Sequence, residues 1–299
     1  MDRITSMRVF VRAASAGSLS AAGRHLGMSP AMATKHVNAL EARLGIKLFH
    51  RTTRRLKLTE AGSNYLDACQ RILPEIDEAE AAATSQRIKA TGLLRMNVPL
   101  SFGVRFVAPL LAEFSHRHPE VNVELGLSDA QLDLIAGRWD LAIRIGRLAN
   151  SPLQARQLGD SCMQVCAAPA YLDQRGVPRT VGELAQHNCL SYTLSAMQDS
   201  QHWAFGRQGE LRVPINGDLV ANNGDALLAA AVAGQGVIYQ PHFIVADAIA
   251  QGDLVVLELD KPVVDLGGIH VLYPPGRRPP AKVRAMIDYL LEAFAKTPP

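Results

Sequence analysis

The stretch Ser29-Pro-Ala-Met-Ala-Thr-Lys-His-Val-Asn-Ala-Leu-Glu-Ala-Arg-Leu44 decides the fold of the first part of the chain. Its beginning is typical of a helix start, because the Ser29 hydroxyl can accept a hydrogen bond from an unpaired amide and Pro30 has no amide to satisfy. Gly45 can end the helix in a left-handed conformation. Between them an apolar stripe recurs at helical spacing and consists of Ala33, Val37, Leu40 and Leu44. The pattern predicts an amphipathic helix over residues 29–44.

The face of this predicted helix opposite the apolar stripe carries small, hydrogen-bonding and cationic side chains. Such side chains let a helix lie in the major groove of DNA and contact the edges of the bases. We therefore predict that this helix reads DNA. The contacts are expected from Ser29, Pro30, Ala31, Thr34, Lys35 and Asn38. A separate apolar pattern at residues 4–16 predicts a first helix that packs beneath the others.

A shorter apolar segment precedes the predicted reading helix and ends at Gly27. Ser18 or Ser20 can cap this segment, and Gly27 can supply the left-handed turn of a tight corner between helices. The small side chains of Ala22 and Gly23 allow the two helices to approach closely. Together the segments predict a helix-turn-helix whose second helix reads DNA. The alternative is an ordinary corner between helices, which also occurs outside DNA-binding proteins.

The segment Lys47-Leu-Phe-His-Arg-Thr-Thr-Arg-Arg-Leu-Lys-Leu58 has apolar ends and a basic middle. It predicts two short strands joined at residues 53–55, which together form a wing beside the helix-turn-helix. The basic residues expected along the phosphate backbone are Arg51, Arg54, Arg55 and Lys57. The alternative is a solvated hairpin that does not contact DNA.

The charge of the chain is unevenly distributed. Residues 1–62 contain 11 of the 31 lysines and arginines but only 3 of the 28 acidic residues, a net charge of +8. The remainder contains 20 basic and 25 acidic residues, so its net charge is −5 and the whole chain carries +3. A basic head on a mildly acidic body places the nucleic-acid contact in the first 62 residues.

Three motifs of this region resemble the amino-terminal domain of the LysR-type transcriptional regulators. They are Gly17-Ser-Leu-Ser-Ala-Ala22, Leu40-Glu-Ala-Arg-Leu-Gly-Ile-Lys-Leu-Phe-His-Arg51 and Leu58-Thr-Glu-Ala-Gly62. The resemblance implies a regulator that binds double-stranded DNA at a partly palindromic promoter site and responds to a small-molecule effector. The family often has Gln, Ser and Arg where this chain has Pro30, Thr34 and Lys35, so the operator sequence stays open.

Thr59 can cap a long linker helix that extends to about Lys89. Apolar residues in it alternate in steps of four and three, which predicts pairing with the same helix of a second chain. The predicted seam consists of Tyr65, Cys69, Ile72, Ile76, Ala79 and Ala83. The alternative is packing on the helix's own domain. Pro74 is expected to bend the helix without breaking it, because the seam continues beyond it. By resemblance the helix makes a homodimer, which is expected to assemble into a homotetramer.

Beyond residue 90 the pattern changes to strands alternating with helices, which predicts an α/β body. Strands are expected at 93–98, 121–127, 141–145, 161–167, 190–193, 203–206, 211–213, 219–220, 237–239, 254–259 and 269–273. Helices are expected at 104–117, 130–136, 170–175, 181–186, 225–233, 243–250 and 281–295.

The family resemblance implies that this body is a two-lobed effector-binding domain, similar in fold to the periplasmic solute-binding proteins. The chain then divides into a winged helix-turn-helix at 1–58, a linker helix at 59–89 and the effector domain at 90–299. One lobe is expected at about 90–160 and 266–299, and the other at about 161–265.

Loops at the strand ends are expected to face the cleft between the lobes and to hold a small molecule. The resemblance assigns pocket positions to Leu100, Ser101, Phe102, Ser128, Asn222 and Asn223. Arg144 is a further candidate, as the charge partner of an anionic ligand. Two predicted helix starts, after Phe102 and at Asn223, present backbone amides, which favours an anionic effector such as a carboxylate. Their few acidic residues, Asp129 and Asp225, can cap helices. Phe102 equally suits a neutral aromatic ligand, and each polar candidate can instead be a capping or turn residue.

Other functions lack their motifs in this sequence. There is no phosphate-binding loop, no Gly-x-Ser-x-Gly elbow and no His-Glu-x-x-His pair, so neither enzyme activity nor a cofactor is expected. His116 and His118 have no accompanying set of metal ligands, so no metal site is expected. The four cysteines are too scattered for a disulfide framework and are expected to be buried thiols. The alternative is redox sensing, which occurs in some members of the family.

The sequence contains no signal peptide and no apolar run long enough to cross a membrane, so a cytoplasmic protein without a membrane partner is expected. A solute-binding protein or an enzyme of the same fold is the chief alternative, but it lacks an export signal and catalytic motifs. An architectural DNA-binding protein without a ligand is a second alternative, against which the two-lobed body argues. The effector and the regulated genes stay undetermined, and so does the choice between activation and repression.

Overall fold

The structure of the chain is a computed structural model, which describes residues 1–51, 56–83, 89–130, 133–148, 151–195, 198–275 and 279–296. The chain divides into two compact units. The N-terminal unit comprises Met1–Leu93, Glu120–Asn122 and Pro280–Lys282, and the C-terminal unit comprises Leu94–Pro119, Val123–Pro279 and Val283–Pro299. Each unit has its own buried core.

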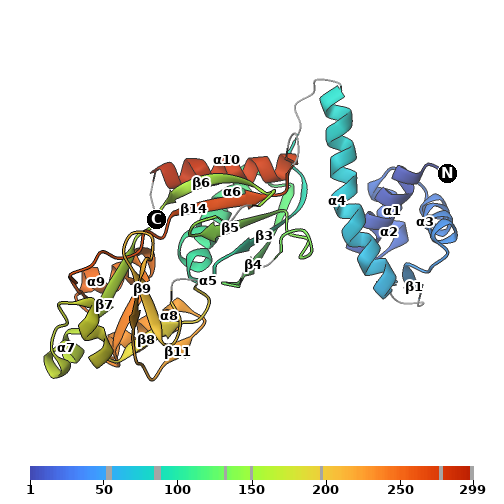
Figure 1. Ribbon diagram of the computed structural model, residues 1–299. Helices are drawn as coiled ribbons and strands as arrows, with labels where there is room; N and C mark the ends of the chain where they lie inside the picture. The colour runs from blue at the N-terminus through green and yellow to red at the C-terminus, as the bar shows by residue number, and fades with distance from the viewer. Residues whose placement is uncertain are drawn as a thin grey trace. The chain divides into compact units, whose positions relative to one another are not determined.

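The N-terminal unit combines helices with a two-stranded wing (Figure 1). Its elements are α1 (Arg3–Ala16), α2 (Leu19–His25), α3 (Pro30–Leu44), β1 (Phe49–Arg51), β2 (Leu56–Leu58) and α4 (Glu60–Ala83). β1 and β2 pair antiparallel, with Phe49 opposite Leu58. The first helix, the helix-turn-helix and the two strands of the wing are therefore confirmed.

The core of the N-terminal unit lies between α1, α2, α3 and the beginning of α4. The stripe predicted on α3 faces this core, since Ala33, Val37 and Leu40 are buried. Gly62, in the first turn of α4, packs so closely on the wing that a Cβ there would lie 2.0 Å from the Leu48 carbonyl oxygen. Only glycine fits this contact without a shift of the backbone.

Helix α4 continues through Pro74, as predicted, but its first half does not form the predicted seam. Tyr65 packs against the ring of Phe10 at 5.6 Å between centroids, and Cys69 is fully buried in the core of the same unit. The prediction that Tyr65 and Cys69 contact a second chain is wrong, because α1 covers that face of the helix. Ile72, in contrast, is 42% exposed.

The far end of the predicted seam lies outside the described residues. The side chains of Ala79 and Ala83 are among those that the structure does not describe, and so are residues 84–88, over which the sequence predicts that the helix continues. The described part of α4 therefore leaves Ile72 and the half-buried Ile76 as the seam residues that can contact another chain.

The first lobe of the C-terminal unit is built on a five-stranded sheet in the order β4-β3-β5-β14-β6. The strands are β3 (Gly92–Val98), β4 (Val121–Leu127), β5 (Leu141–Ile145), β6 (Gln154–Asp160) and β14 (Gly268–Tyr273). β3 and β5 are parallel, whereas β14 runs antiparallel to β5 and β6. β6 is not predicted from the sequence, because this edge strand buries only Leu158 and lacks alternating apolar side chains.

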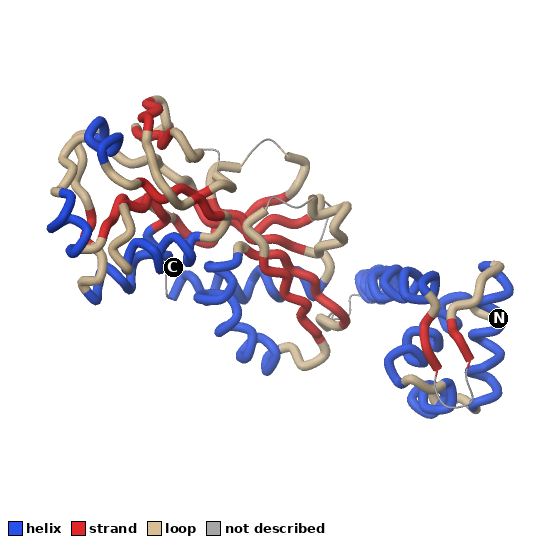
Figure 2. The backbone as a smooth tube through the Cα atoms, turned by 90° about the horizontal axis from the view of Figure 1, so that it is seen from below, coloured by secondary structure: helices blue, strands red, loops and turns tan. Residues whose placement is uncertain are grey.

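A composite helix and α10 (Ala281–Lys296) pack along this sheet (Figures 1 and 2). The composite helix consists of α5 (Leu100–Phe102), the π segment η1 (Gly103–Val107), the 3-10 segment η2 (Ala108–Leu110) and α6 (Leu111–Arg117). Its predicted start at residue 104 is therefore wrong. Pro109 accounts for the irregular middle, since it has no amide for the helical ladder. The helix predicted at 130–136 is also wrong, because residues 134–136 form a turn.

The second lobe is built on a sheet in the order β11-β8-β12-β7-β13 and a separate hairpin. The sheet strands are β7 (Met163–Ala167), β8 (Cys189–Tyr192), β11 (Val220–Ala221), β12 (Val237–Pro241) and β13 (Val255–Val256), and the hairpin consists of β9 (His202–Phe205) and β10 (Leu211–Pro214). The helices are α7 (Pro169–Arg175), η3 (Val181–Gln186), α8 (Gly224–Val232) and α9 (His242–Gln251). β13 is shorter than the strand predicted at 254–259.

The chain enters the second lobe between β6 and β7 and returns to the first between β13 and β14. On the return path the Val264 amide donates a hydrogen bond to the Tyr239 hydroxyl at 2.7 Å, and Val264 is buried. Tyr239 itself is fully buried and stacks on Phe205 at 5.1 Å between ring centroids. The return segment is thus anchored in the core of the second lobe.

The four cysteines differ in their surroundings. Cys69, Cys166 and Cys189 are buried, whereas Cys162 is exposed directly before β7, so the expectation of a buried thiol is wrong for Cys162. Burial raises the pKa of Cys69 to about 11 and that of Cys166 and Cys189 to about 12, which keeps these thiols protonated. No helix within the described ranges is long and apolar enough to cross a membrane.

Candidate DNA-binding helix and effector pocket

Helix α3 is fixed at both ends by the residues that the sequence singles out. The Ser29 hydroxyl accepts a hydrogen bond from the Met32 amide at 3.2 Å, and Pro30 occupies the first turn. Gly45 ends the helix with a φ of 70°. These local features hold the helix in place, because they satisfy or avoid backbone groups that have no partner inside the helix.

The predicted reading residues lie on the outer face of α3. The exposed ones are Ser29, Pro30, Ala31, Lys35 and Asn38. Thr34 is half-buried, and its hydroxyl donates to the Pro30 carbonyl at 2.9 Å, which leaves its oxygen lone pairs and its methyl group for a base. Met32 is also 42% exposed on this helix and was not predicted, since an apolar residue in an apolar-rich segment is normally assigned to the core.

A buried carboxylate joins α3 to the wing. Glu41 is 3% exposed, and its Oε1 accepts from the amides of Leu48 at 3.0 Å and Phe49 at 3.3 Å, while its Oε2 accepts from Lys47 Nζ at 2.9 Å. Burial alone raises the pKa of Glu41, but the hydrogen bonds from Lys47, Leu48 and Phe49 outweigh it and hold the pKa below its ordinary value. The wing is therefore held to α3 by an ionised group that the sequence analysis did not single out.

A second buried polar contact connects α3 to α1. Asp2 caps α1 by accepting from the Thr5 amide at 2.7 Å, and the Ser6 hydroxyl donates to the Asp2 carbonyl at 2.7 Å. His36 Nδ1 lies 2.9 Å from the Ser6 oxygen, which assigns the proton to Nδ1. Both Ser6 and His36 are buried, so this network fixes the inner face of α3.

The wing lies partly outside the described residues. β1 and β2 place His50 opposite Lys57, and Lys57 is exposed. The side chain of Arg51, and Arg54 and Arg55 altogether, lie outside the described residues. The predicted phosphate contacts of these three arginines therefore stay predictions.

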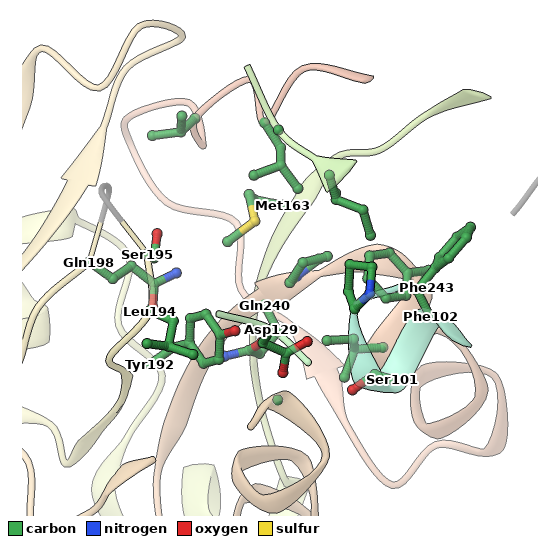
Figure 3. A pocket seen from close by; sticks show the side chains of 18 of the residues that line it. Ser101, Phe102, Asp129, Met163, Tyr192, Leu194, Ser195, Gln198, Gln240 and Phe243 are labelled. Carbon is green, nitrogen blue, oxygen red and sulfur yellow. The ribbon is translucent and has the colours of Figure 1, made fainter. Parts of the chain in front are cut away.

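A pocket of about 250 Å³ lies between the two lobes of the C-terminal unit (Figure 3). From the first lobe its lining includes Pro99, Ser101, Phe102, Asp129 and residues 144–147. From the second lobe and the return segment it includes Met163, Tyr192, Leu194, Ser195, Gln198, Gly224, residues 240–241, Phe243, Ile244 and residues 264–266. Figure 3 shows Ser101, Phe102 and Phe243 on one side and Tyr192, Leu194, Ser195 and Gln198 on the other.

Three of the seven predicted effector residues line this pocket, namely Ser101, Phe102 and Arg144. The other four have local roles. Leu100 is 37% exposed, and the Ser128 hydroxyl accepts from the Ala130 amide at 3.3 Å. Asn222 is exposed, and Asn223 caps α8 by accepting from the Ala226 amide at 3.1 Å. For Ser128 and Asn223 the capping and turn alternative describes the observed contacts, whereas Leu100 and Asn222 are exposed residues outside the pocket lining.

The two acidic residues near the predicted helix starts make contacts across the chain. Asp129 accepts from the Leu100 amide at 2.8 Å and is hydrogen-bonded to Tyr192 of the other lobe. Burial, and then the Asp129 carboxylate, raise the pKa of the Tyr192 hydroxyl. Asp225 accepts from the Ser101 hydroxyl at 2.6 Å and from Arg105 at 2.8 Å, so it also links the lobes.

These contacts correct the argument for an anion at the helix starts. The Leu100 amide that would have met a ligand is already bound to Asp129, and the Ala226 amide is bound to Asn223. The α segment that begins at Leu100 is also only three residues long before the π segment. At each helix start, one amide that could have met a ligand is therefore already bound within the protein.

Arg144 supplies a cation to the pocket instead. Its guanidinium donates to Asn97 Oδ1 at 2.7 Å and to the Ile143 carbonyl at 3.2 Å, two neutral acceptors. Burial lowers the pKa of Arg144, because water no longer solvates its charge fully. A partly desolvated guanidinium in a cavity wall is the residue type that binds carboxylates through two parallel hydrogen bonds.

The sequence analysis missed Tyr192, Gln198 and Gln240. Tyr192 ends β8 and Gln240 stands near the end of β12, but in the second lobe the sequence analysis applied the rule that ligands meet strand ends only to the loop at Asn222 and Asn223. Gln198 lies in an irregular segment with no sequence signal. Within the described ranges no group of three His, Cys, Asp or Glu side chains can hold a metal ion.

Comparisons with known proteins agree with this arrangement. Residues 4–63 match the family model for bacterial regulatory helix-turn-helix proteins of the lysR family, and residues 88–295 match the LysR substrate binding domain. An uncharacterised HTH-type transcriptional regulator of Haemophilus influenzae is 36% identical over 284 residues, which cover 95% of this chain and 98% of that protein. The HTH-type transcriptional activator AaeR of Escherichia coli is 33% identical, with 99% of this chain and 95% of that protein covered.

A solved structure extends the likeness to the whole chain. The structure of CrgA from Neisseria meningitidis, described as a LysR-type transcriptional regulator, has a TM-score of 0.61 and 32% identity. The match covers 96% of this chain and 97% of that chain.

Proposed function

This chain belongs to the LysR family of transcriptional regulators, and we propose that it binds a partly palindromic promoter site and responds to an anionic metabolite. DNA binding and an effector-binding domain are properties of the family to which the chain belongs. The proposal adds two points to these family properties, namely that the operator is partly palindromic and that the effector is an anion. Each point has its own support.

The anionic effector is supported by the position of Arg144 in the pocket wall. Arg144 lies in the pocket wall and its charge is partly desolvated, so a carboxylate there would compensate the lost hydration. The acidic residues of the pocket favour a cationic ligand less than their number suggests. The charge of Asp129 already receives hydrogen bonds from Leu100 and Tyr192.

Binding of purified full-length protein to acids tests the effector proposal. Arg144→Met should weaken the binding of a carboxylate effector about tenfold to a hundredfold, as expected for a charge-assisted hydrogen bond of about 1.5–3 kcal/mol. The matched control is Arg156→Met, an exposed arginine of β6 outside the pocket, which should leave the affinity unchanged. Equal affinity of the Arg144→Met protein and the wild type would contradict the proposal.

The palindromic site follows from a dimer with two-fold symmetry, in which two copies of α3 read two half-sites. We propose that the dimer forms through α4, at Ile72 and Ile76, and that two dimers form a tetramer. The support is the exposure of Ile72, since a large apolar side chain on the outer face of a long helix is typical of a pairing surface.

Sedimentation of full-length variants tests the pairing surface. Glutamate at both Ile72 and Ile76 should give smaller species than the wild type, because two like charges would enter an apolar seam without partners. The matched control is glutamate at Asn64, an exposed residue of the same helix. Unchanged sedimentation of the double variant would place the dimer contact elsewhere. A footprint on the promoter that protects a single half-site would contradict the palindrome.

A further inference from the structure

Two buried glutamines of the pocket wall have amide atoms without a partner. Gln198 is 4% exposed and Gln240 is 2% exposed. Within the described part of the chain, neither Gln198 Oε1 nor Gln240 Nε2 has a hydrogen-bond partner. Both residues line the pocket, and Figure 3 labels Gln198 beside Ser195 and Gln240 beside Asp129. A buried polar atom without a partner is unfavourable, and in native proteins such atoms gather at functional sites.

The orientation of the Gln198 amide is fixed by its neighbour. Its Nε2 donates to the Tyr239 carbonyl at 2.7 Å, and a carbonyl can only accept, so the unpaired atom of Gln198 is an acceptor. The unpaired atom of Gln240 is a donor, and Gln240 directly follows Tyr239 on β12. An unpaired acceptor and an unpaired donor therefore belong to two side chains that line the same pocket, and Gln198 is bound to the residue that precedes Gln240.

A ligand group that both donates and accepts would satisfy these two atoms together. A hydroxyl is the smallest such group, since its proton can go to Gln198 Oε1 while its oxygen accepts from Gln240 Nε2. A carboxylate alone cannot do this, because an ionised carboxylate only accepts. Both amide atoms are covered in this conformation, so a ligand reaches them when the groups that cover them move, while the Gln198 amide keeps its bond to the Tyr239 carbonyl.

We infer that the effector is a hydroxy acid whose hydroxyl is bound by Gln198 and Gln240 and whose acid group is bound by Arg144. This inference rests on the proposed anionic effector and adds the hydroxyl. The pocket lining also includes the apolar side chains of Phe102, Phe243 and Met163. The ligand therefore has a compact apolar skeleton that separates its two polar groups.

Calorimetric titration of the full-length protein with matched compounds tests the inference. The probes are phenylacetate, its three ring-hydroxylated derivatives and the corresponding ethylphenols, together with butyrate, the hydroxybutyrates and simple butanols. Each series contains compounds with both groups, one compound with the acid alone and compounds with the hydroxyl alone. At least one hydroxy acid should bind about tenfold more tightly than its matched acid, because that acid leaves the glutamine atoms unpaired.

Two variants separate this role from a structural one. Gln198→Met and Gln240→Met keep side-chain length but remove the amide, so the preference for the hydroxy acid over its matched acid should fall from about tenfold to about onefold. The affinity for the acid alone should change little. The control is Gln251→Met, an exposed glutamine at the end of α9 outside the pocket, which should keep the full preference. Because the preference is a ratio within one protein, a general loss of stability does not alter it.

Each outcome decides one of the two proposals. Acids that bind equally well with and without the hydroxyl overturn the hydroxy-acid inference and leave the anionic effector standing. Phenols or butanols that bind while the acids do not overturn the anionic effector and support the role of the glutamines. If no compound of either series binds, both are overturned. A preference that survives Gln198→Met and Gln240→Met removes these residues from recognition of the hydroxyl.

Discussion

The outer face of α3 and the effector pocket hold their polar side chains in different ways. On α3 the ordering hydrogen bonds are local, as in the bond from Thr34 to Pro30 four residues earlier. In the pocket they join distant residues of different lobes, as between Ser101 and Asp225 or between Tyr192 and Asp129. Substitutions on the face of α3 should therefore alter DNA binding alone, whereas substitutions at the lobe contacts should alter binding and stability together.

The largest expected effect lies beneath the reading face. Gly62→Ala should destabilise the N-terminal unit by about 3 kcal/mol, because the new Cβ meets the Leu48 carbonyl oxygen and the backbone must move. Hydrogen exchange of α3, followed by mass spectrometry, measures this loss. Both tryptophans of the chain, Trp139 and Trp203, belong to the C-terminal unit, so their fluorescence should report unchanged unfolding there.

The matched control for this prediction is Gly182→Ala in η3. There the nearest heavy atom to a new Cβ is the Thr180 hydroxyl at 3.9 Å, so stability should change little. Equal hydrogen exchange of α3 in the Gly62→Ala protein and the wild type would show that α4 and the wing are not in close contact.

The second effect is at Glu41, which supports the reading face from inside. Glu41→Ala should cost about 2 kcal/mol, since it leaves the buried amides of Leu48 and Phe49 unpaired. Glu41→Gln keeps an oxygen acceptor and should cost about 1 kcal/mol, mainly through the lost charge. Hydrogen exchange of α3 again gives the measurement. A larger cost for Gln than for Ala would contradict the assigned hydrogen bonds.

The pH dependence of the same unit sharpens this prediction. The pKa of Glu41 is lower in the folded state than its ordinary value, so its stabilisation is present above about pH 4.5 and is lost as the pH falls through the folded-state pKa. The wild type should therefore lose more stability than Glu41→Gln on acidification below about pH 4.5. Parallel curves for the two proteins would contradict the lowered pKa.

The two regions also differ in how far the sequence predicts them. The helix-turn-helix follows from local signals, because Ser29, Pro30 and Gly45 fix their own helix and the apolar stripe fixes its inner face. The sequence analysis missed Glu41 because it binds the backbone amides of Leu48 and Phe49. Every residue except proline has such an amide, so a sequence does not show which ones are bound. Tyr65 and Cys69 have the spacing of a seam, but the same spacing serves packing within one chain.

The pocket was predicted only in part, because its geometry depends on contacts between distant residues. Ser101 and Phe102 were assigned through the family resemblance and Arg144 as the charge partner of an anion, and all three line the pocket. The hydrogen bond from the Leu100 amide to Asp129 removes this amide from the predicted anion site at the helix start. No sequence feature near either residue predicts that bond. The side chain of Gln198 is held at the pocket by its hydrogen bond to the Tyr239 carbonyl, 41 positions later in the sequence. Periodicity and capping rules describe segments, whereas a pocket is made where segments meet.

The third effect tests the outer face of α3 itself. Lys35→Ala should weaken operator binding by about 1–3 kcal/mol if Lys35 contacts a guanine, and by less if it contacts a phosphate. Thermal unfolding should stay unchanged, because Lys35 is exposed. Titrations at several salt concentrations distinguish the two contacts, since a phosphate contact lowers the salt slope by about one unit on operator and random DNA alike. Undiminished affinity, as in a Lys296→Ala control, would remove Lys35 from the reading face.

The smallest expected effect is at Arg105, where the lobes meet. Its guanidinium pairs with Asp225 at 2.8 Å and with Asp247 at 3.4 Å, and Asp225 also accepts from Ser101 of the pocket wall. Because these side chains are partly exposed, Arg105→Met should destabilise the C-terminal unit by only about 1 kcal/mol, and high salt should reduce the difference.

Tryptophan fluorescence during denaturant unfolding, in low salt and in high salt, measures this change. The control is Lys296→Met, whose pair with Glu292 lies on the exposed surface of α10, and its stability should stay close to the wild type.

If the pocket and the outer face of α3 differ as described, Arg105→Met should also change effector binding. Since Asp225 then loses its pair with Arg105 and keeps its bond to Ser101, the pocket wall loses part of its support, and effector binding should weaken along with stability. Lys35→Ala should change DNA binding without any change in stability. If Arg105→Met lowers stability but leaves effector binding intact, the lobe contacts and the pocket act independently, and the contrast with α3 fails.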